Sequence, residues 1–329
     1  MSLKNVVYLF GAGATHAEIL TLEEDSPSGV FRDRNGLLIS NVSQRVIKEA
    51  QKHRWFKNNE DVFTSAKGSF NIEMLISLFE NNRVPDSHIA YLKNLVKKDI
   101  RKRLSDSRRR QFYLHKALFE LHLRIEERET LSGMISLNYD DVLDEAYGNV
   151  LGHSLNYCFT SATGDTRPLL KLHGSFNWRR ITIYGRRKDI SIVPIGINKN
   201  YLAPPYNFIR GRAFELLVNC DVLRIVGCSL NQNDTGLVDL LFKAHLERGK
   251  KIDIEPIDFQ PLNGHHPIRN NYGFFPGIVD PIEIEETLIT DQAIYKSEVG
   301  NPFKIWLKAK AERMLGEDIH KTRHLKKCL

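Results

Sequence analysis

Four short polar stretches of the sequence could do chemistry, because each follows a run of apolar residues and offers groups that bind or react with a ligand. Glycine turns at the start of a helix bind phosphate through backbone N–H groups and the helix dipole. Asparagine and aspartate orient polar substrates, and histidine exchanges protons near neutral pH. The residues concerned are Gly11, Ala12, Gly13, Ala14 and Thr15, then Asn138 and Asp140, then His173, and finally Gly227, Ser229 and Asn231.

The first stretch has part of a dinucleotide-binding fingerprint. Apolar or aromatic residues at 6–10 indicate a buried strand, and Gly11-Ala12-Gly13 then turns the chain toward a helix. A dinucleotide-binding Rossmann turn would carry a third glycine three residues further on, where this chain has His16. Gly-Ala-Gly also occurs in tight turns that bind nothing, so the pattern leaves both interpretations open.

The elements that must position these residues follow an alternating pattern. Apolar runs typical of buried strands are separated by helical spacing, and most of them end in a small or polar turn. We therefore predict an α/β fold: a Rossmann-like, mostly parallel sheet with helices on both faces. In such sheets ligands bind at the carboxyl ends of the strands, which is where the polar residues lie. The predicted strands lie within 6–10, 133–141, 169–174, 190–197 and 221–230.

The long stretch between the first two predicted strands has helical spacing instead. From Ile72 to Phe79, for example, apolar residues recur every three or four positions. We predict that this stretch is a helical insertion into the sheet domain. The predicted parts are a sheet domain at 1–38 and 131–290, a helical insertion at 39–130, and a C-terminal helix with a basic tail at 291–329.

Length and cysteine content limit the class of protein. The 329 residues suffice for one large α/β domain with an insertion, or for two modest domains. There is no apolar run of about 18 residues and no charged-then-apolar leader at Met1, so we expect no membrane span, no secretory signal and a cytoplasmic location. The four cysteines form no C-x-x-C pair, which argues against a zinc ribbon and a disulfide framework. We expect no bound metal.

Positive charge is concentrated in one stretch. The net charge of the chain is +7, and residues 93–110 alone hold nine Lys or Arg against Asp99 and Asp106, which also gives +7. Such a run could bind a phosphate backbone, but no aromatic residue lies within it to stack on a base. We favour a solvated helix or a protein-docking face, so any contact with nucleic acid would be indirect.

Each polar stretch also has a purely structural interpretation. Asp140 or Asp141 could cap the helix that follows. His173 could be a buried structural histidine. The stretch at 228–234 could cap the helix at 237–246. The occurrence of all these stretches together, at the ends of predicted strands, favours a binding or catalytic site.

The order of these motifs resembles that of the sirtuins, and more closely that of the sirtuin-like NAD hydrolases of bacterial antiphage defence. Sirtuins carry Gly-Ala-Gly-x-Ser at the first turn, then Gln-Asn-Ile-Asp, then His-Gly after a strand, then Gly-Thr-Ser-Leu. This chain has GAGAT at 11–15, LNYD at 137–140, LHGSFNW at 172–178 and GCSL at 227–230. Order and approximate spacing agree over residues 5 to about 250.

The departures from the family pattern narrow the expected activity. Protein-deacylating sirtuins hold zinc with two pairs of cysteines, and this chain has neither pair, so deacylation is not expected. Leu137 replaces the glutamine of the family, and the phenylalanine-arginine element after the glycine turn is matched only by the late SGVFRDR at 28–34, which contains Arg32. The helical insertion and the LKLHGSFNW stretch are similar to those of the defence-type proteins.

The resemblance implies that NAD+ is a substrate that the protein cleaves. The backbone of residues 11–15 would bind the pyrophosphate of NAD+. Gly227 and Ser229 would hold the adenosine-side ribose, and Asn231 is a further expected contact with NAD+.

Breaking the bond between nicotinamide and ribose shifts positive charge onto the ribose, so the site needs polar groups that hold the sugar and the carboxamide. We assign three catalytic residues on this basis. Asn138 would orient the ribose or a water, Asp140 would bind the nicotinamide carboxamide, and His173 would accept a proton from a ribose hydroxyl or from water.

We therefore expect an NAD+ glycohydrolase that releases nicotinamide and ADP-ribose, and that acts in antiphage defence by depleting NAD+ once it is triggered. One alternative is a subunit that binds NAD or ADP-ribose without cleaving it. Another is a zinc-less ADP-ribosyltransferase or deacylase. We expect a homo-oligomer, with a DNA-translocating ATPase or an Argonaute-like protein as candidate defence partners, and no association with membranes.

Overall fold

A computed structural model describes the greater part of the chain. The predicted strand at 190–197, Ser229 and Asn231 lie outside the described residues. The described residues are 3–24, 36–59, 71–108, 112–152, 155–159, 167–176, 178, 181–183, 186–188, 201–202, 204–228, 234–249, 252–257 and 301–328.

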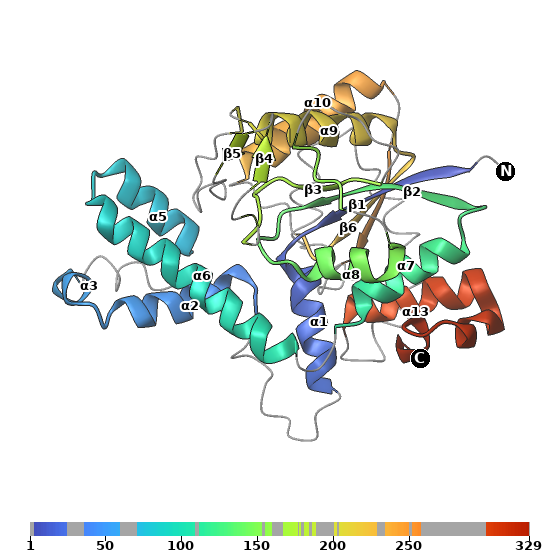
Figure 1. The fold of residues 1–329 in the computed structure, drawn as a ribbon, viewed down its shortest axis with the longest axis horizontal. Helices are drawn as coiled ribbons and strands as arrows, with labels where there is room; N and C mark the ends of the chain where they lie inside the picture. Colours follow the sequence, from blue (N-terminus) through green and yellow to red (C-terminus); the bar gives the residue numbers. More distant parts are fainter. Residues whose placement is uncertain are drawn as a thin grey trace, which may run out of the picture.

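A five-stranded sheet forms the centre of the molecule (Figure 1). The strand order is β3-β2-β1-β6-β7, and every neighbouring pair is parallel. The α/β fold class predicted from the sequence is confirmed. The strands are β1 (Lys4–Phe10), β2 (Glu129–Ser136), β3 (Leu169–Lys171), β6 (Val222–Val226) and β7 (Asp253–Ile257), and a separate antiparallel pair joins β4 (Ile181–Ile183) to β5 (Arg186–Lys188).

Four of the five parallel strands lie where apolar runs predict them, but β7 was not predicted. The reason is visible in its sequence, DIEPI, in which charged residues and a proline interrupt the apolar pattern. Glu255 is nevertheless placed inside the sheet because it forms an ion pair with Arg224 of the neighbouring strand. A tertiary partner thus compensates for a residue that is rare in buried strands.

The sheet is covered by helices on both faces, because successive side chains of a strand point to opposite sides. Val7 and Leu9 of β1 belong to one cluster, which α9 (Tyr206–Asn219) and α10 (Thr235–Arg248) complete. Tyr8 and Phe10 belong to the other cluster, on the opposite face. The helices that complete this second cluster are α7 (Leu114–Arg124), α8 (Val142–Leu151) and α13 (Pro302–Leu315).

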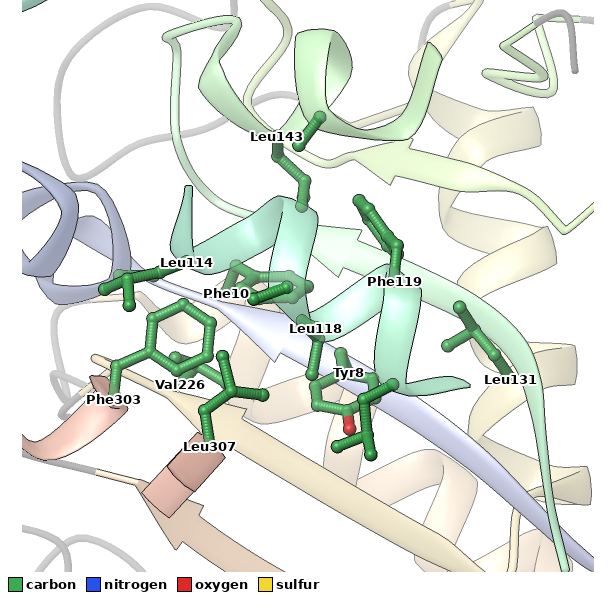
Figure 2. Packing of buried hydrophobic residues seen from close by; sticks show 14 of the residues in the cluster. Tyr8, Phe10, Leu114, Leu118, Phe119, Leu131, Leu143, Val226, Phe303 and Leu307 are labelled. Carbon is green, nitrogen blue, oxygen red and sulfur yellow. The ribbon is translucent and has the colours of Figure 1, made fainter. Parts of the chain in front are cut away.

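Figure 2 shows this second face, where Tyr8 and Phe10 of β1 lie among Leu118 of α7 and Phe303 and Leu307 of α13. The helix after β1, α1 (Ala12–Glu24), contacts both α7 and α13. Two short 3-10 helices, η1 (Gly316–Lys321) and η2 (Leu325–Cys328), follow α13 and pack against it. None of the helices in the described ranges is long and apolar enough to cross a membrane.

Four helices lie beside the sheet rather than on it (Figure 1). All four bury apolar residues in a third cluster. The domain limits drawn from the sequence stay a prediction. Within the predicted insertion at 39–130, α7 packs on the sheet, whereas the other helices form the third cluster. These are α2 (Ile39–Ala50), α3 (Arg54–Asn58), α5 (Ile72–Asn81) and α6 (Asp86–Arg108).

A network of charged side chains is buried at the amino-terminal half of the sheet. Arg224 is fully buried and forms ion pairs with Glu129 at 2.7 Å and with Glu255 at 2.6 Å. Lys310 of α13 also pairs with Glu129, at 2.6 Å. Buried charges are stable only when they are paired in this way, so the network ties the C-terminal helix to the sheet.

Tyr8 connects His122 of α7 to this network. The hydroxyl of Tyr8 accepts a hydrogen bond from Arg224 at 3.0 Å and shares a second hydrogen bond with Nε2 of His122, at 2.7 Å. Burial and the charge of Arg224 lower the pKa of His122 to about 3. Burial alone would raise the pKa of Glu129, but the hydrogen bonds and charges of Arg224 and Lys310 outweigh it and lower that pKa to about 2.

These two groups predict a loss of stability in acid. His122 titrates at 6.5 when it is exposed and at about 3 in the folded protein, so the unfolded chain takes up the proton first. The free energy of unfolding should therefore fall as the pH drops from about 6.5 through about 3, and Glu129 should extend the loss toward about pH 2.

The His122→Gln variant isolates the contribution of the histidine, because the glutamine amide can donate a hydrogen bond to Tyr8 or accept one from it but does not titrate. Urea unfolding of wild type and variant at pH 7 and pH 5 should show a smaller difference between the two pH values for the variant. An equal difference in both proteins would mean that His122 is not held neutral by the fold.

Candidate functional site

The turns after β1, β2, β3 and β6 meet at the carboxyl edge of the sheet. The ends of these strands are aligned, because Phe10 pairs with both Ser136 and Val226, and Ser136 pairs with Lys171. Stretches far apart in the sequence therefore lie side by side. The structure brings together the predicted site residues Gly11, Ala12, Gly13, Ala14, Thr15, Asn138, Asp140, His173 and Gly227.

The glycines of two turns allow an unusually close approach of their backbones. Gly13 donates its N–H to the carbonyl of Gly227 at 2.9 Å. A Cβ atom on Gly11 would lie 2.5 Å from the carbonyl oxygen of Gly227, and one on Gly227 would lie 2.3 Å from the nitrogen of Ala14. Gly227 also has a φ of +57°, in the left-handed region that favours glycine. The turns after β1 and β6 therefore pack tightly against each other through their backbones.

This packing uses several of the amides that were expected to bind phosphate. The N–H groups of Gly11, Gly13 and Ala14 donate to carbonyl oxygens of Val226, Gly227 and Gly11, respectively. Ala12 is exposed and begins α1, so the amino-terminal end of that helix still faces outward with its dipole. Binding of an anion at this turn stays a prediction that depends on Ala12 and the helix dipole.

Asn138 is held in one orientation by two hydrogen bonds. Its amide nitrogen donates to the carbonyl of Gly11 at 2.9 Å and to the hydroxyl of Thr15 at 3.1 Å. A side-chain amide has two N–H donors, and both are used here. The amide oxygen of Asn138 is therefore fixed on the other side, where it can accept a hydrogen bond from a ligand.

Asp140 completes the chain of hydrogen bonds. It accepts from the hydroxyl of Thr15 at 2.9 Å with one oxygen, and from the backbone N–H of Val142 at 3.1 Å with the other. The capping interpretation of Asp140 is therefore confirmed. Burial raises the pKa of this carboxyl above its usual value, although the charge of Lys171 opposes the shift. A direct contact between Asp140 and nicotinamide stays a prediction, because both oxygens are engaged within the protein.

A buried ion pair stabilises the segment that carries Asp140. Lys171, at the end of β3, is 1% exposed, and its ammonium group lies 2.8 Å from the carboxylate of Asp144. The same ammonium group donates to the backbone carbonyl of Asp140. A buried ammonium group needs such partners, so Lys171 fixes the backbone between β2 and α8.

His173 is buried and both of its ring nitrogens face acceptors. Nδ1 lies 3.1 Å from the carbonyl of Leu137, and Nε2 lies 3.0 Å from a carboxylate oxygen of Asp234. A carbonyl oxygen only accepts, so Nδ1 carries a proton. Asp234 is also the N-cap of α10, where it accepts from the N–H of Leu237. The histidine and the aspartate therefore form a rigid pair at the edge of the sheet.

Aromatic rings enclose this pair. Tyr139 lies 5.9 Å from the ring of His173, and Tyr201 stacks on it at 6.4 Å between ring centroids. The hydroxyl of Tyr139 is buried without a hydrogen-bond partner in the described part of the chain. Burial, and then the charge of Glu73 on α5, raises the pKa of this hydroxyl well above its usual value. A helix of the insertion thus faces the site.

The sequence patterns missed several residues of this edge. The sequence indicated the stretch that ends at Asp234 only as a helix cap, which the hydrogen bond from Leu237 confirms. The contacts of Asp234 and Tyr201 with His173 arise from the tertiary structure, and no local motif predicts them. Lys171 could have been suspected, since a lysine inside an apolar strand needs a partner. Within the described residues, no group of three or more His, Cys, Asp or Glu side chains is placed to hold a metal ion.

A substitution at Gly227 tests whether the two turns pack as closely as described. Gly227→Ala would combine left-handed strain with a backbone clash, so we expect a loss of stability on the order of 4 kcal/mol. Gly249→Ala is the matched control, because its φ of +65° is similar but a Cβ there meets nothing within 4 Å. It should cost only about 1–2 kcal/mol. Urea unfolding measures both, and equal losses would contradict the packing described.

No protein-family profile and no curated protein sequence matches this chain. Among solved structures, the chain is similar to a Sir2 homologue in complex with NAD, at 16% identity and a TM-score of 0.35, with 88% of this chain and 91% of that chain covered. It is also similar to a Sir2 homologue variant in complex with ADP-ribose, at 14% identity and a TM-score of 0.33, with 90% and 94% covered. At such TM-scores the likeness carries no argument about activity, which must come from the site itself.

Proposed function

We propose that this protein is an NAD+ glycohydrolase, which cleaves NAD+ to nicotinamide and ADP-ribose. The observation that carries the proposal is the fixed orientation of Asn138, whose two N–H groups are held by Gly11 and Thr15. Its oxygen is thereby presented at the edge where parallel α/β sheets bind ligands. The motifs that resemble those of sirtuin-like NAD hydrolases lie at this same edge.

The proposed binding mode places the two halves of NAD+ on neighbouring turns. The pyrophosphate lies at the amino-terminal end of α1, near exposed Ala12. The adenosine-side ribose lies by Gly227, with Ser229 and Asn231 as further contacts implied by the motif. The nicotinamide-side ribose then lies toward Asn138 and His173.

The chemistry of the bond explains which groups the site needs. Nicotinamide leaves as a neutral molecule because its ring nitrogen is already positively charged in NAD+, so no general acid is required. The ribose left behind has oxocarbenium character, and the fixed oxygen of Asn138 can stabilise it by accepting a hydrogen bond from a ribose hydroxyl or from the attacking water. Asp140 acts through Thr15 by keeping this amide oriented.

The attacking water must lose a proton when it bonds to the ribose. In the proposed mechanism Nε2 of His173 accepts it, because Nδ1 already carries a proton, and the carboxylate of Asp234, 3.0 Å from Nε2, stabilises the imidazolium that forms. The attacking water must then reach Nε2 beside Asp234.

The second candidate function is NAD or ADP-ribose binding without cleavage. It is favoured by one observation: His173 is only 5% exposed, and both of its nitrogens face acceptors of the protein itself. A histidine of this kind can be purely structural. If the protein cleaves NAD+, His173 is needed for turnover. If it only binds NAD or ADP-ribose, His173 is needed for folding.

We further propose that the enzyme acts in antiphage defence by depleting NAD+, and that a trigger raises its activity from a low basal level. The proposal of a homo-oligomer, and of a DNA-translocating ATPase or an Argonaute-like protein as partner, has the same basis in the motif resemblance. An unrestrained NAD+ hydrolase would harm its own host, which is the reason to expect control.

Replacing Asn138 tests the catalytic assignment. We expect Asn138→Ala to lower nicotinamide release at least about a hundredfold, because loss of a positioned polar group costs on the order of 2–4 kcal/mol in the barrier. Thr15→Val should give a smaller loss, since it removes the hydroxyl that joins Asn138 to Asp140 but keeps the shape of the side chain. Chromatography of nicotinamide after incubation with NAD+ measures both variants. Wild-type turnover by Asn138→Ala would remove this residue from the mechanism.

His173→Ala separates the two candidate functions. If the histidine takes part in catalysis, nicotinamide release should be lost while NAD+ still raises the melting temperature, since a ligand stabilises the state that binds it. If the histidine is only structural, the melting temperature should fall by several degrees, because a cavity and an unpaired Asp234 remain. Thermal melting with and without NAD+, run beside the activity assay, gives the answer.

A further inference from the structure

The basic helix of the insertion reaches the loop that carries His173. Arg101, on α6, donates a hydrogen bond from its guanidinium group to the backbone carbonyl of Phe176 at 2.8 Å. The guanidinium carbon also lies 5.7 Å from the centre of the Phe176 ring, and the ammonium nitrogen of Lys97 lies 5.9 Å from it. Two cationic side chains of α6 therefore contact the loop at 172–176.

Phe176 also contacts the turn that carries Asn138. Its ring stacks on Tyr139 at 5.4 Å with an interplanar angle of 18°, and its backbone N–H donates to the carbonyl of Tyr139 at 2.9 Å. Ser175 donates to the same carbonyl at 3.2 Å. Since Tyr139 also packs against His173, a continuous set of contacts joins Arg101 to the proposed proton acceptor.

Two further charged residues of α6, Lys93 and Asp99, are used differently. Lys93 pairs with Glu80 of α5 at 2.6 Å, and Asp99 pairs with Arg45 of α2 at 2.7 Å. Both pairs lie within the insertion and stabilise its own packing. Arg101 instead reaches across to the sheet, so the stretch interpreted from sequence as a solvated or docking helix has an additional role at the site.

We infer that Arg101 is a positioning residue for His173, acting through Phe176 and Tyr139; this inference rests on the proposed NAD+ cleavage. Arginine suits the position because its planar group donates in the plane while its face lies over an aromatic ring. Loss of that clamp lets the loop shift, and a small displacement of a catalytic group is enough to slow a reaction strongly. Arg101 does not touch the reacting atoms.

The experiment compares Arg101→Ala and Arg101→Lys with Lys98→Ala. Lys98 is the matched control because it lies on the same helix, carries the same charge and is exposed. Arg101→Ala should lower kcat for nicotinamide release about tenfold with KM for NAD+ changed less than twofold. Arg101→Lys should recover part of the loss, since a lysine keeps the cation near the ring. Lys98→Ala should behave as wild type.

A second measurement does not depend on turnover. In NMR spectra of the imidazole groups, with the His173 signals identified by His173→Gln, Arg101→Ala should shift the His173 signals, whereas Lys98→Ala should leave them unchanged. If wild-type protein releases no nicotinamide, the proposed function fails, yet the NMR comparison still decides the positioning role. Phe176→Leu, which keeps the carbonyl and removes the ring, should shift the same signals and serves if Arg101→Ala does not fold. Unchanged His173 signals in the folded variants would overturn the inference.

Discussion

The hydrogen-bond chain from Asn138 through Thr15 to Asp140 is the interaction on which the rest of the site depends. The role of each group in the chain is determined by its chemistry: the amide nitrogen donates, the hydroxyl accepts from it and donates to the carboxylate, and the carboxylate accepts. The direction of the chain is therefore fixed, and with it the position of the Asn138 oxygen. Because the chain joins the turn after β1 to the turn after β2, any shift of one turn changes what the other presents.

The surrounding structure holds those turns in place. Gly227 and Gly13 bring the turns after β6 and β1 into backbone contact. The buried Lys171 fixes the segment after β2 through its hydrogen bond to the carbonyl of Asp140. The pair of His173 and Asp234 then joins the loop after β3 to the start of α10. The insertion adds Arg101 from outside the sheet. An edge assembled from so many separate elements is rigid, which is what stabilisation of a developing charge requires.

Much of this architecture could be predicted from the sequence, but not its cross-connections. Continuous apolar runs predicted β1, β2, β3 and β6, and the rule for parallel sheets placed the polar turns at one edge. The strand β7 was missed because its charged and proline residues break the pattern. Asp234 beside His173, and Arg101 beside Phe176, join parts that are distant in sequence, and no local spacing encodes such contacts. The Gly-Ala-Gly turn predicted a phosphate site, whereas its amides mostly serve close packing.

We propose that this edge of the sheet breaks the bond between nicotinamide and ribose. The most direct measurement is a proton NMR time course of NAD+ with purified protein at a concentration close to that of NAD+. We expect the signals of NAD+ to disappear while those of free nicotinamide and ADP-ribose grow in equal amounts. NAD+ that remains intact over many hours, while it still raises the melting temperature of the protein, would contradict cleavage and leave only binding.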